Sequence, residues 1–349
     1  MRTPRTVHLH VGSHKAGSTA IQEAFYGYED SRLRYSKIGV PNHSVAIYTI
    51  FSGKRYDFTP YRKRGVLPSD VDRIAQEYRQ RYEEDFLRDS KDLILSAETI
   101  SILDQDEVRD LRDFLRRYFD DIHIVGYVRS PWDFVTSSFQ QHLKGGQKGF
   151  HLPNPNYRFR FKKIYDLFDR GIEIAKYDTQ QFEGQSVIFD FCQRLGADPS
   201  RIKDRTLNVG MSAKAAKFLL HFALYGPKAD GSPQHNKALE RFVELLVEGL
   251  PGPKFQLPKG LVKRNVQSED LEWLFEATGI DFRQLHDQSV SPEITQERYL
   301  EEMASFSPEE LDELRSLLRR ERVAIDVSGD VSQTLALLFD HFRIEESAD

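Results

Sequence analysis

The sequence predicts an α/β protein, in which a three-layer parallel sheet is followed by a helical C-terminal part. Short apolar strands alternate with amphipathic helices up to about residue 210, a pattern typical of a parallel sheet covered by helices on both faces. A glycine-containing loop joins the first predicted strand, residues 7–11, to a helix that begins at Ser18. From Met211 onward only helical patterns remain.

We expect a single domain over residues 1–349, with an α/β core at about 6–210 and a helical part at about 211–349. No long Gly/Ser-rich or Pro-rich linker separates the two parts, which favours a helical lobe packed on the core over an independent domain.

The strands of the predicted sheet are short and rich in β-branched residues. They are expected at 7–11, 92–95, 122–128 and 172–175, with a further extended segment at 35–40. Apolar residues three and four positions apart predict helices at 18–28, 106–119, 130–144, 161–170, 185–195, 213–225, 237–250, 269–278, 308–321 and 331–342. Another helix is expected to begin at an N-cap residue, Ser69. Gly196 is expected to close the predicted helix 185–195.

Composition excludes several classes of function. The formal net charge of −5 gives no general attraction to nucleic acid, and the single cysteine, Cys192, cannot form an internal disulfide and is expected in the core. No apolar run approaches the roughly 20 residues of a membrane span, and the residues before the first strand are too few for a signal peptide. We therefore expect a cytoplasmic protein without a membrane span or a nucleic-acid partner.

The loop after the first strand has the composition of an anion site. Backbone N–H groups and the positive end of a helix dipole converge where a strand, such a loop and a helix follow one another. Compared with the nucleotide-binding P-loop, Gly12, Gly17 and Thr19 keep their places, whereas Ser18 occupies the lysine position and Lys15 lies earlier in the loop. Neither neighbouring strand end supplies a carboxylate at once for Mg²⁺, and the histidines lack metal-binding spacing, so no metal is expected.

The segment His14-Lys15-Ala16-Gly17-Ser18-Thr19 resembles the 5′-phosphosulfate loop of sulfotransferases that use 3′-phosphoadenosine-5′-phosphosulfate (PAPS). That loop usually reads P-K-[TS]-G-[TS]-[TS], so this chain departs from it at His14 and Ala16. Arg129, at the end of a predicted strand, and Ser137, eight positions later in the predicted helix 130–144, resemble the 3′-phosphate site of the same family. The resemblance covers about residues 7–196.

The resemblance implies a P-loop-like fold with PAPS as donor and adenosine 3′,5′-bisphosphate (PAP) as product. It implies donor contacts from the six loop residues, His14 to Thr19, and from Arg129 and Ser137. Lys15 suits the stabilisation of charge on the leaving oxygen. The general base is left open between Glu98, which could instead be a turn residue, and His43, which could instead be a surface loop residue.

The leading hypothesis is therefore a sulfotransferase that transfers a sulfuryl group from PAPS to a hydroxyl of a small-molecule or glycan acceptor, such as a carbohydrate or a glycolipid. Two alternatives remain open. One is a P-loop kinase or NTPase, and the other is a non-catalytic nucleotide-binding protein of the same fold. The acceptor and the oligomeric state are not predicted.

Overall fold

The structure is a computed structural model that describes residues 4–12, 15–168, 172–202, 210–230, 232–286, 294–325 and 330–348. The chain forms two compact units, each assembled from several stretches of sequence. Unit 1 contains Met1–Ser130, Asn156–Leu207 and Ser268–Arg283, and unit 2 contains Pro131–Pro155, Asn208–Gln267 and Gln284–Asp349. The prediction of a single domain stays a prediction.

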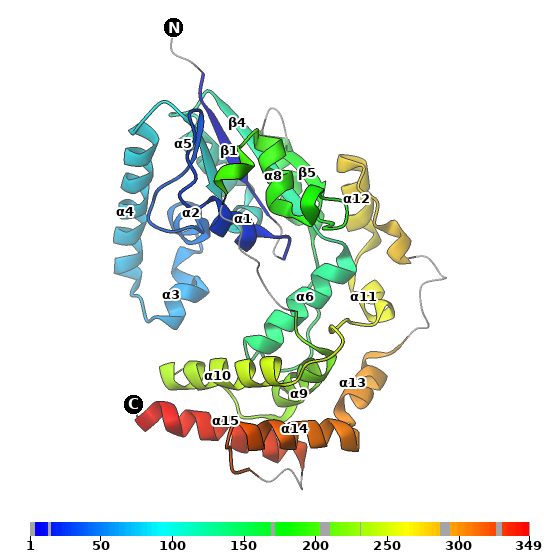
Figure 1. Ribbon diagram of the computed structural model, residues 1–349. Helices are drawn as coiled ribbons and strands as arrows, with labels where there is room; N and C mark the ends of the chain where they lie inside the picture. Colours follow the sequence, from blue (N-terminus) through cyan, green and yellow to red (C-terminus); the bar gives the residue numbers. More distant parts are fainter. Residues whose placement is uncertain are drawn as a thin grey trace. The chain divides into compact units, whose positions relative to one another are not determined.

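Unit 1 is built on a five-stranded sheet in which all strands are parallel (Figure 1). The strands are β1 (Thr6–His10), β2 (Leu33–Tyr35), β3 (Asp92–Ser96), β4 (Asp121–Val128) and β5 (Ile172–Lys176), in the order β2-β3-β1-β4-β5. The predicted α/β fold class is confirmed. Since β1 lies between β3 and β4, the loop that follows β1 emerges at the middle of the carboxyl edge of the sheet, where ligands bind in such folds.

The helices of unit 1 include those predicted, with shifted ends, and a short helix at 59–63 that the sequence did not predict. They are α1 (Ser18–Phe25), α2 (Ser44–Phe51), α3 (Thr59–Lys63), α4 (Pro68–Leu87), α5 (Gln105–Leu115), α7 (Tyr157–Leu167), α8 (Val187–Leu195) and α12 (Ser268–Thr278), with a 3₁₀ helix η2 at Glu98–Ile102. Gly196 ends α8 with a left-handed φ of 61°, as predicted. The prediction of Ser69 as an N-cap is wrong: Pro68 already occupies the first turn, where its fixed φ suits a helix start.

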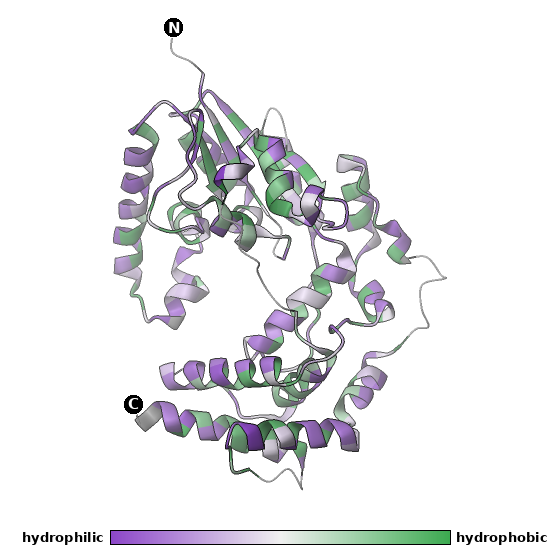
Figure 2. Ribbon diagram, viewed as in Figure 1, coloured by the Kyte–Doolittle hydropathy of each residue, from purple (hydrophilic) through white to green (hydrophobic). Residues whose placement is uncertain are grey.

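One face of the sheet is covered by α1 and α8. Phe25 of α1 and Phe191 of α8 are fully buried and lie 5.1 Å apart between ring centroids. Cys192 is buried beside them, which confirms the prediction that it belongs to the core. Figure 2 shows α8 largely hydrophobic and α4 largely hydrophilic, as expected for a packed helix and a solvent-facing one.

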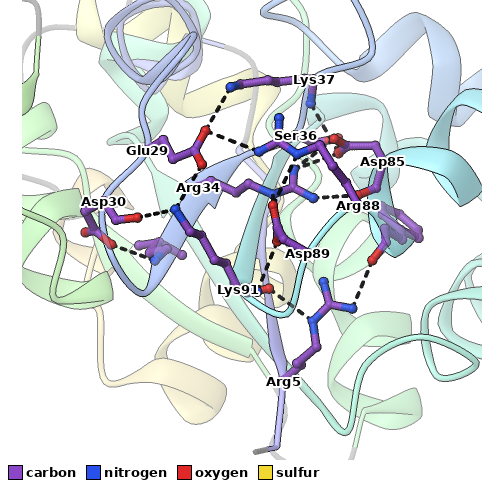
Figure 3. A network of polar contacts seen from close by, with 12 residues as sticks. Arg5, Glu29, Asp30, Arg34, Ser36, Lys37, Asp85, Arg88, Asp89 and Lys91 are labelled. Atoms are coloured by element: carbon purple, nitrogen blue, oxygen red, sulfur yellow. Dashed lines mark hydrogen bonds and ion pairs between the residues drawn. The ribbon is translucent and has the colours of Figure 1, made fainter.

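A buried ion pair ties β2 to the end of α4 (Figure 3). Arg34 of β2 is 0% exposed, and its guanidinium donates to both carboxylate oxygens of Asp85 at 2.9 and 3.0 Å. The same guanidinium donates from Nε to Asp89, and the Ser36 hydroxyl donates to Asp85. The buried, hydrogen-bonded pair therefore attaches this short strand to the last turn of α4.

Unit 2 contains helices and no strand within its described residues. Its helices are α6 (Pro131–Lys144), α9 (Ala213–Tyr225), α10 (Pro233–Gly249), α11 (Lys259–Asn265), α13 (Gln296–Ala304), α14 (Pro308–Arg320) and α15 (Val331–Ala348). Phe222, Phe242 and Phe339 bring α9, α10 and α15 together in its core. The sequence did not predict α11 and α13. No helix in the described part of the chain is long and apolar enough to cross a bilayer.

Candidate anion site

The loop between β1 and α1 has a backbone that alternates in handedness. Lys15 and Gly17 have left-handed φ values of 72° and 81°, and Ala16 between them keeps a negative φ. Such alternation turns successive N–H groups toward one side and forms an anion-binding concavity, here at the N-terminus of α1. Ser13 and His14 lie outside the described residues, so the predicted donor contact of His14 is not addressed.

Both described glycines of the loop, Gly12 and Gly17, lie at close approaches. A Cβ at Gly17 would lie 2.7 Å from the Tyr177 ring and 2.9 Å from Val187, and the positive φ is a second reason for glycine. A Cβ at Gly12 would lie 2.1 Å from Ser18 Oγ. The two ends of the loop therefore meet at Gly12 and Ser18.

The remaining loop side chains differ in accessibility. Ala16 is fully buried in the hydrophobic core under α1, so it offers the site only its backbone. Ser18 is 3% exposed, whereas Thr19 is exposed. Lys15 is half-buried.

Arg129, the first residue after β4, supports the loop. Its Nη1 donates to the backbone oxygen of Lys15 at 3.1 Å, and its guanidinium lies 5.4 Å from the centre of the Tyr177 ring. Tyr177 in turn follows β5, and its N–H donates to the backbone oxygen of Val128. Strand ends β4 and β5 thus hold the loop that follows β1. The sequence placed Arg129 at the site but did not predict its bond to the loop or the role of Tyr177.

Ser137, the predicted partner of Arg129, is a half-buried residue of α6. It belongs to unit 2, whereas Arg129 belongs to unit 1. Their joint contact with a 3′-phosphate stays a prediction.

Glu98 is the first residue of η2, two positions after the last residue of β3. It is half-buried at the carboxyl edge of the sheet. Burial lowers the pKa of His10 to about 4 and lowers the pKa of Arg160, and the negative charge of Glu98 opposes both shifts. Glu98 therefore lies near the end of β1 and near Arg160 of α7, whose Nη1 donates to Ser101 Oγ at 3.2 Å. The sequence contained no signal for Arg160.

His43 is fully buried, so the interpretation of this histidine as a surface loop residue is wrong. Its Nδ1 accepts a hydrogen bond from the Ser96 backbone N–H at 3.1 Å, and its ring stacks on Tyr35 at 4.9 Å. Burial lowers the pKa of His43 to about 4. These contacts are those of a packed core histidine. The assignment of the base to Glu98 or His43 stays a prediction.

The end of β4 is also fixed by α7. Tyr157 is fully buried and donates from its hydroxyl to the backbone oxygen of Arg129 at 2.6 Å. The first turn of α7 is capped from α12, since the Asp270 carboxylate accepts the N–H groups of Tyr157 and Arg158 at 2.9 and 2.7 Å. Such a cap satisfies N–H groups that have no partner within the helix.

Comparisons with known proteins give little guidance to the function. No protein-family model and no curated protein matches the sequence. Among solved structures, the chain is similar to the sulfotransferase domain from the olefin synthase of Synechococcus PCC 7002, with a TM-score of 0.37 and 14% sequence identity. The match covers 80% of this chain and 97% of that domain. At this TM-score we rest no argument on the likeness, and the function is argued from the site.

Proposed function

We propose that the protein is a PAPS-dependent sulfotransferase. The observation that carries the proposal is the segment Lys15–Gly17 after β1, whose backbone alternates in handedness and whose Lys15 carbonyl accepts a hydrogen bond from Arg129 at the next strand end. A concave set of N–H groups with one lysine and one arginine suits a doubly anionic phosphosulfate. The donor contacts proposed are those of His14, Lys15, Ala16, Gly17, Ser18, Thr19, Arg129 and Ser137.

In the proposed reaction an acceptor hydroxyl oxygen forms a bond to the sulfur of PAPS as the bond between sulfur and the bridging oxygen breaks. The products are a sulfate ester and PAP. Glu98 takes the proton of the hydroxyl, and Lys15 stabilises the negative charge that develops on the leaving oxygen. The acceptor would be a small molecule or glycan, such as a carbohydrate or a glycolipid, met in the cytoplasm.

A kinase or NTPase of the P-loop class has less support. Such enzymes use a carboxylate on a neighbouring strand to hold Mg²⁺. In this chain β3 ends at Ser96, whose hydroxyl lies 2.7 Å from His10 Nδ1. The nearest carboxylate after that strand, Glu98, is the one proposed as the base.

Thermal unfolding in the presence of nucleotides tests the proposal. PAP should raise the melting temperature without added metal, because ligands that bind the native state stabilise it by mass action. ATP should have less effect, since it lacks a 3′-phosphate. Stabilisation by ATP with Mg²⁺ but not by PAP would favour the kinase. Binding of PAP with no transfer to any hydroxyl acceptor, and no hydrolysis of PAPS, would favour the non-catalytic alternative.

A further inference from the structure

Two buried polar atoms beside the loop, Ser18 Oγ at the start of α1 and His10 Nε2 at the end of β1, have no hydrogen-bond partner within the described residues. Ser18 is 3% exposed and His10 is 1% exposed. Buried polar atoms in native proteins are nearly always hydrogen-bonded, and the exceptions often mark a site where a ligand or a water supplies the partner.

The two atoms face the same small space. A Cβ at Gly12 would lie 2.1 Å from Ser18 Oγ and 3.4 Å from His10 Nε2. Because residue 12 has no Cβ, the Ser18 hydroxyl and His10 Nε2 can both lie close to the backbone at the point where the loop begins.

The ring of His10 is held in one orientation. Its Nδ1 lies 2.7 Å from Ser96 Oγ, and its centroid lies 5.2 Å from that of Phe191 and 5.9 Å from that of Tyr127. Since Nδ1 is bound to Ser96, Nε2 is the nitrogen that faces Gly12. Burial lowers the pKa of His10 to about 4, so that the ring is neutral near pH 7 and carries a single N–H.

We propose that His10 is a binding residue of the anion site: the neutral ring donates from Nε2 to an oxygen of the phosphate or sulfate group in the loop, beside the hydroxyl of Ser18. The Nδ1 atom then accepts a hydrogen bond from the Ser96 hydroxyl, which fixes the tautomer. This inference rests on the proposed function, because it takes the loop 12–19 as the place of the anion.

Two substitutions separate the two ring nitrogens. His10→Asn keeps a polar atom near the position of Nδ1 and removes the donor at Nε2, whereas His10→Gln places an amide N–H near the position of Nε2. We expect His10→Asn to weaken PAP binding, measured by calorimetry, roughly tenfold or more, as when a hydrogen bond to a charged group is lost. We expect His10→Gln to remain within about threefold of the wild type.

His8→Asn is the matched control. His8 is also a buried histidine of β1 whose Nε2 has no hydrogen-bond partner within the described residues, but it lies two residues farther from the loop, and its Nδ1 lies 3.0 Å from Nδ1 of His123. This variant should bind PAP like the wild type. If PAP binds the wild type and His10→Asn equally well, His10 fills a structural role only and the inference is wrong while the proposed function stands. If PAP and inorganic sulfate fail to bind the wild type, the proposed function fails and the inference fails with it.

A measurement on the wild type avoids any effect of the variants on folding. Nitrogen-15 spectra of the imidazole groups, recorded with and without PAP, report which ring nitrogen carries the proton. The expected result is a protonated Nε2 of His10 in the PAP complex, with Nδ1 unprotonated. A complex in which Nε2 carries no proton would contradict the inference.

Discussion

Lys15 is a non-glycine residue in the left-handed region, with a φ of 72°. Backbone strain of this kind costs about 1–3 kcal/mol and is concentrated at functional sites. We therefore expect Lys15→Gly to be more stable than Lys15→Ala by about 1 kcal/mol in urea unfolding, the reverse of the usual order of the two residues.

The same two variants should lose turnover of PAPS far more than they lose affinity for PAP, because the lysine acts on charge that develops in the transition state. A Lys15→Gly variant that is less stable than Lys15→Ala would show that the loop backbone is not strained in solution.

Arg129 combines three features that a lysine cannot reproduce together: a bond to the Lys15 backbone, a contact with the Tyr177 ring and further donors for an anion. We expect Arg129→Ala to weaken PAP binding by about 2–4 kcal/mol, and Arg129→Lys to recover only a minor part of that loss. Calorimetric titration with PAP measures both. Full recovery in Arg129→Lys would mean that only the charge of this residue matters.

At the scale of elements, the attachment of β2 to α4 depends on the buried pair Arg34 and Asp85. Asp85→Ala would leave a buried guanidinium without its main counter-charge, and should lower the free energy of unfolding by about 3–5 kcal/mol. Asp89→Ala is the control, because the Asp89 side chain is 24% exposed and its pairing is therefore weaker. Equal losses in the two variants, measured by denaturant unfolding, would contradict this account.

The parts of the fold that were predicted correctly are those encoded locally. The helices 213–225 and 269–278, the end of α8 at Gly196 and the strand-loop-helix unit around Gly12 all depend on neighbours in sequence. Other features depend on residues far apart in the chain. They are the hydrogen bond from Arg129 to Lys15, the packing that buries His43 and the cap of α7 by Asp270. No periodicity or spacing carries such information, so the supports of the candidate site were missed.

The whole molecule contains several histidines that are buried in neutral form. Burial lowers the pKa values of His8, His10 and His43 to about 4, below the ordinary value of 6.5. As the pH falls below 6.5, these histidines bind protons in the unfolded chain but stay neutral in the folded protein. The free energy of unfolding should therefore be fully retained above pH 6.5 and decrease steadily toward pH 4.

Melting temperatures recorded from pH 8 to pH 4 measure this loss. His8→Asn, which removes one of the three groups, should make the decline between pH 6.5 and pH 4 shallower than in the wild type. A melting temperature that stays level from pH 7 to pH 5 would be incompatible with neutral buried histidines.

The cap of α7 by the Asp270 carboxylate also has a consequence for shortened versions of the protein. A fragment that ends at residue 210 would keep all five strands, the loop and Arg129. It would lack α12, so the N–H groups of Tyr157 and Arg158 would lose the Asp270 carboxylate that accepts their hydrogen bonds. The Tyr157 side chain, whose hydroxyl donates to the Arg129 carbonyl at the end of β4, would then be held less firmly. The sheet and the anion loop therefore do not form a fragment that keeps its structure without the rest of unit 1. A segment encoded about 60 residues downstream of that cut completes their support, so shortened or fused versions of this protein need α12 to keep the Arg129 end of the site in place.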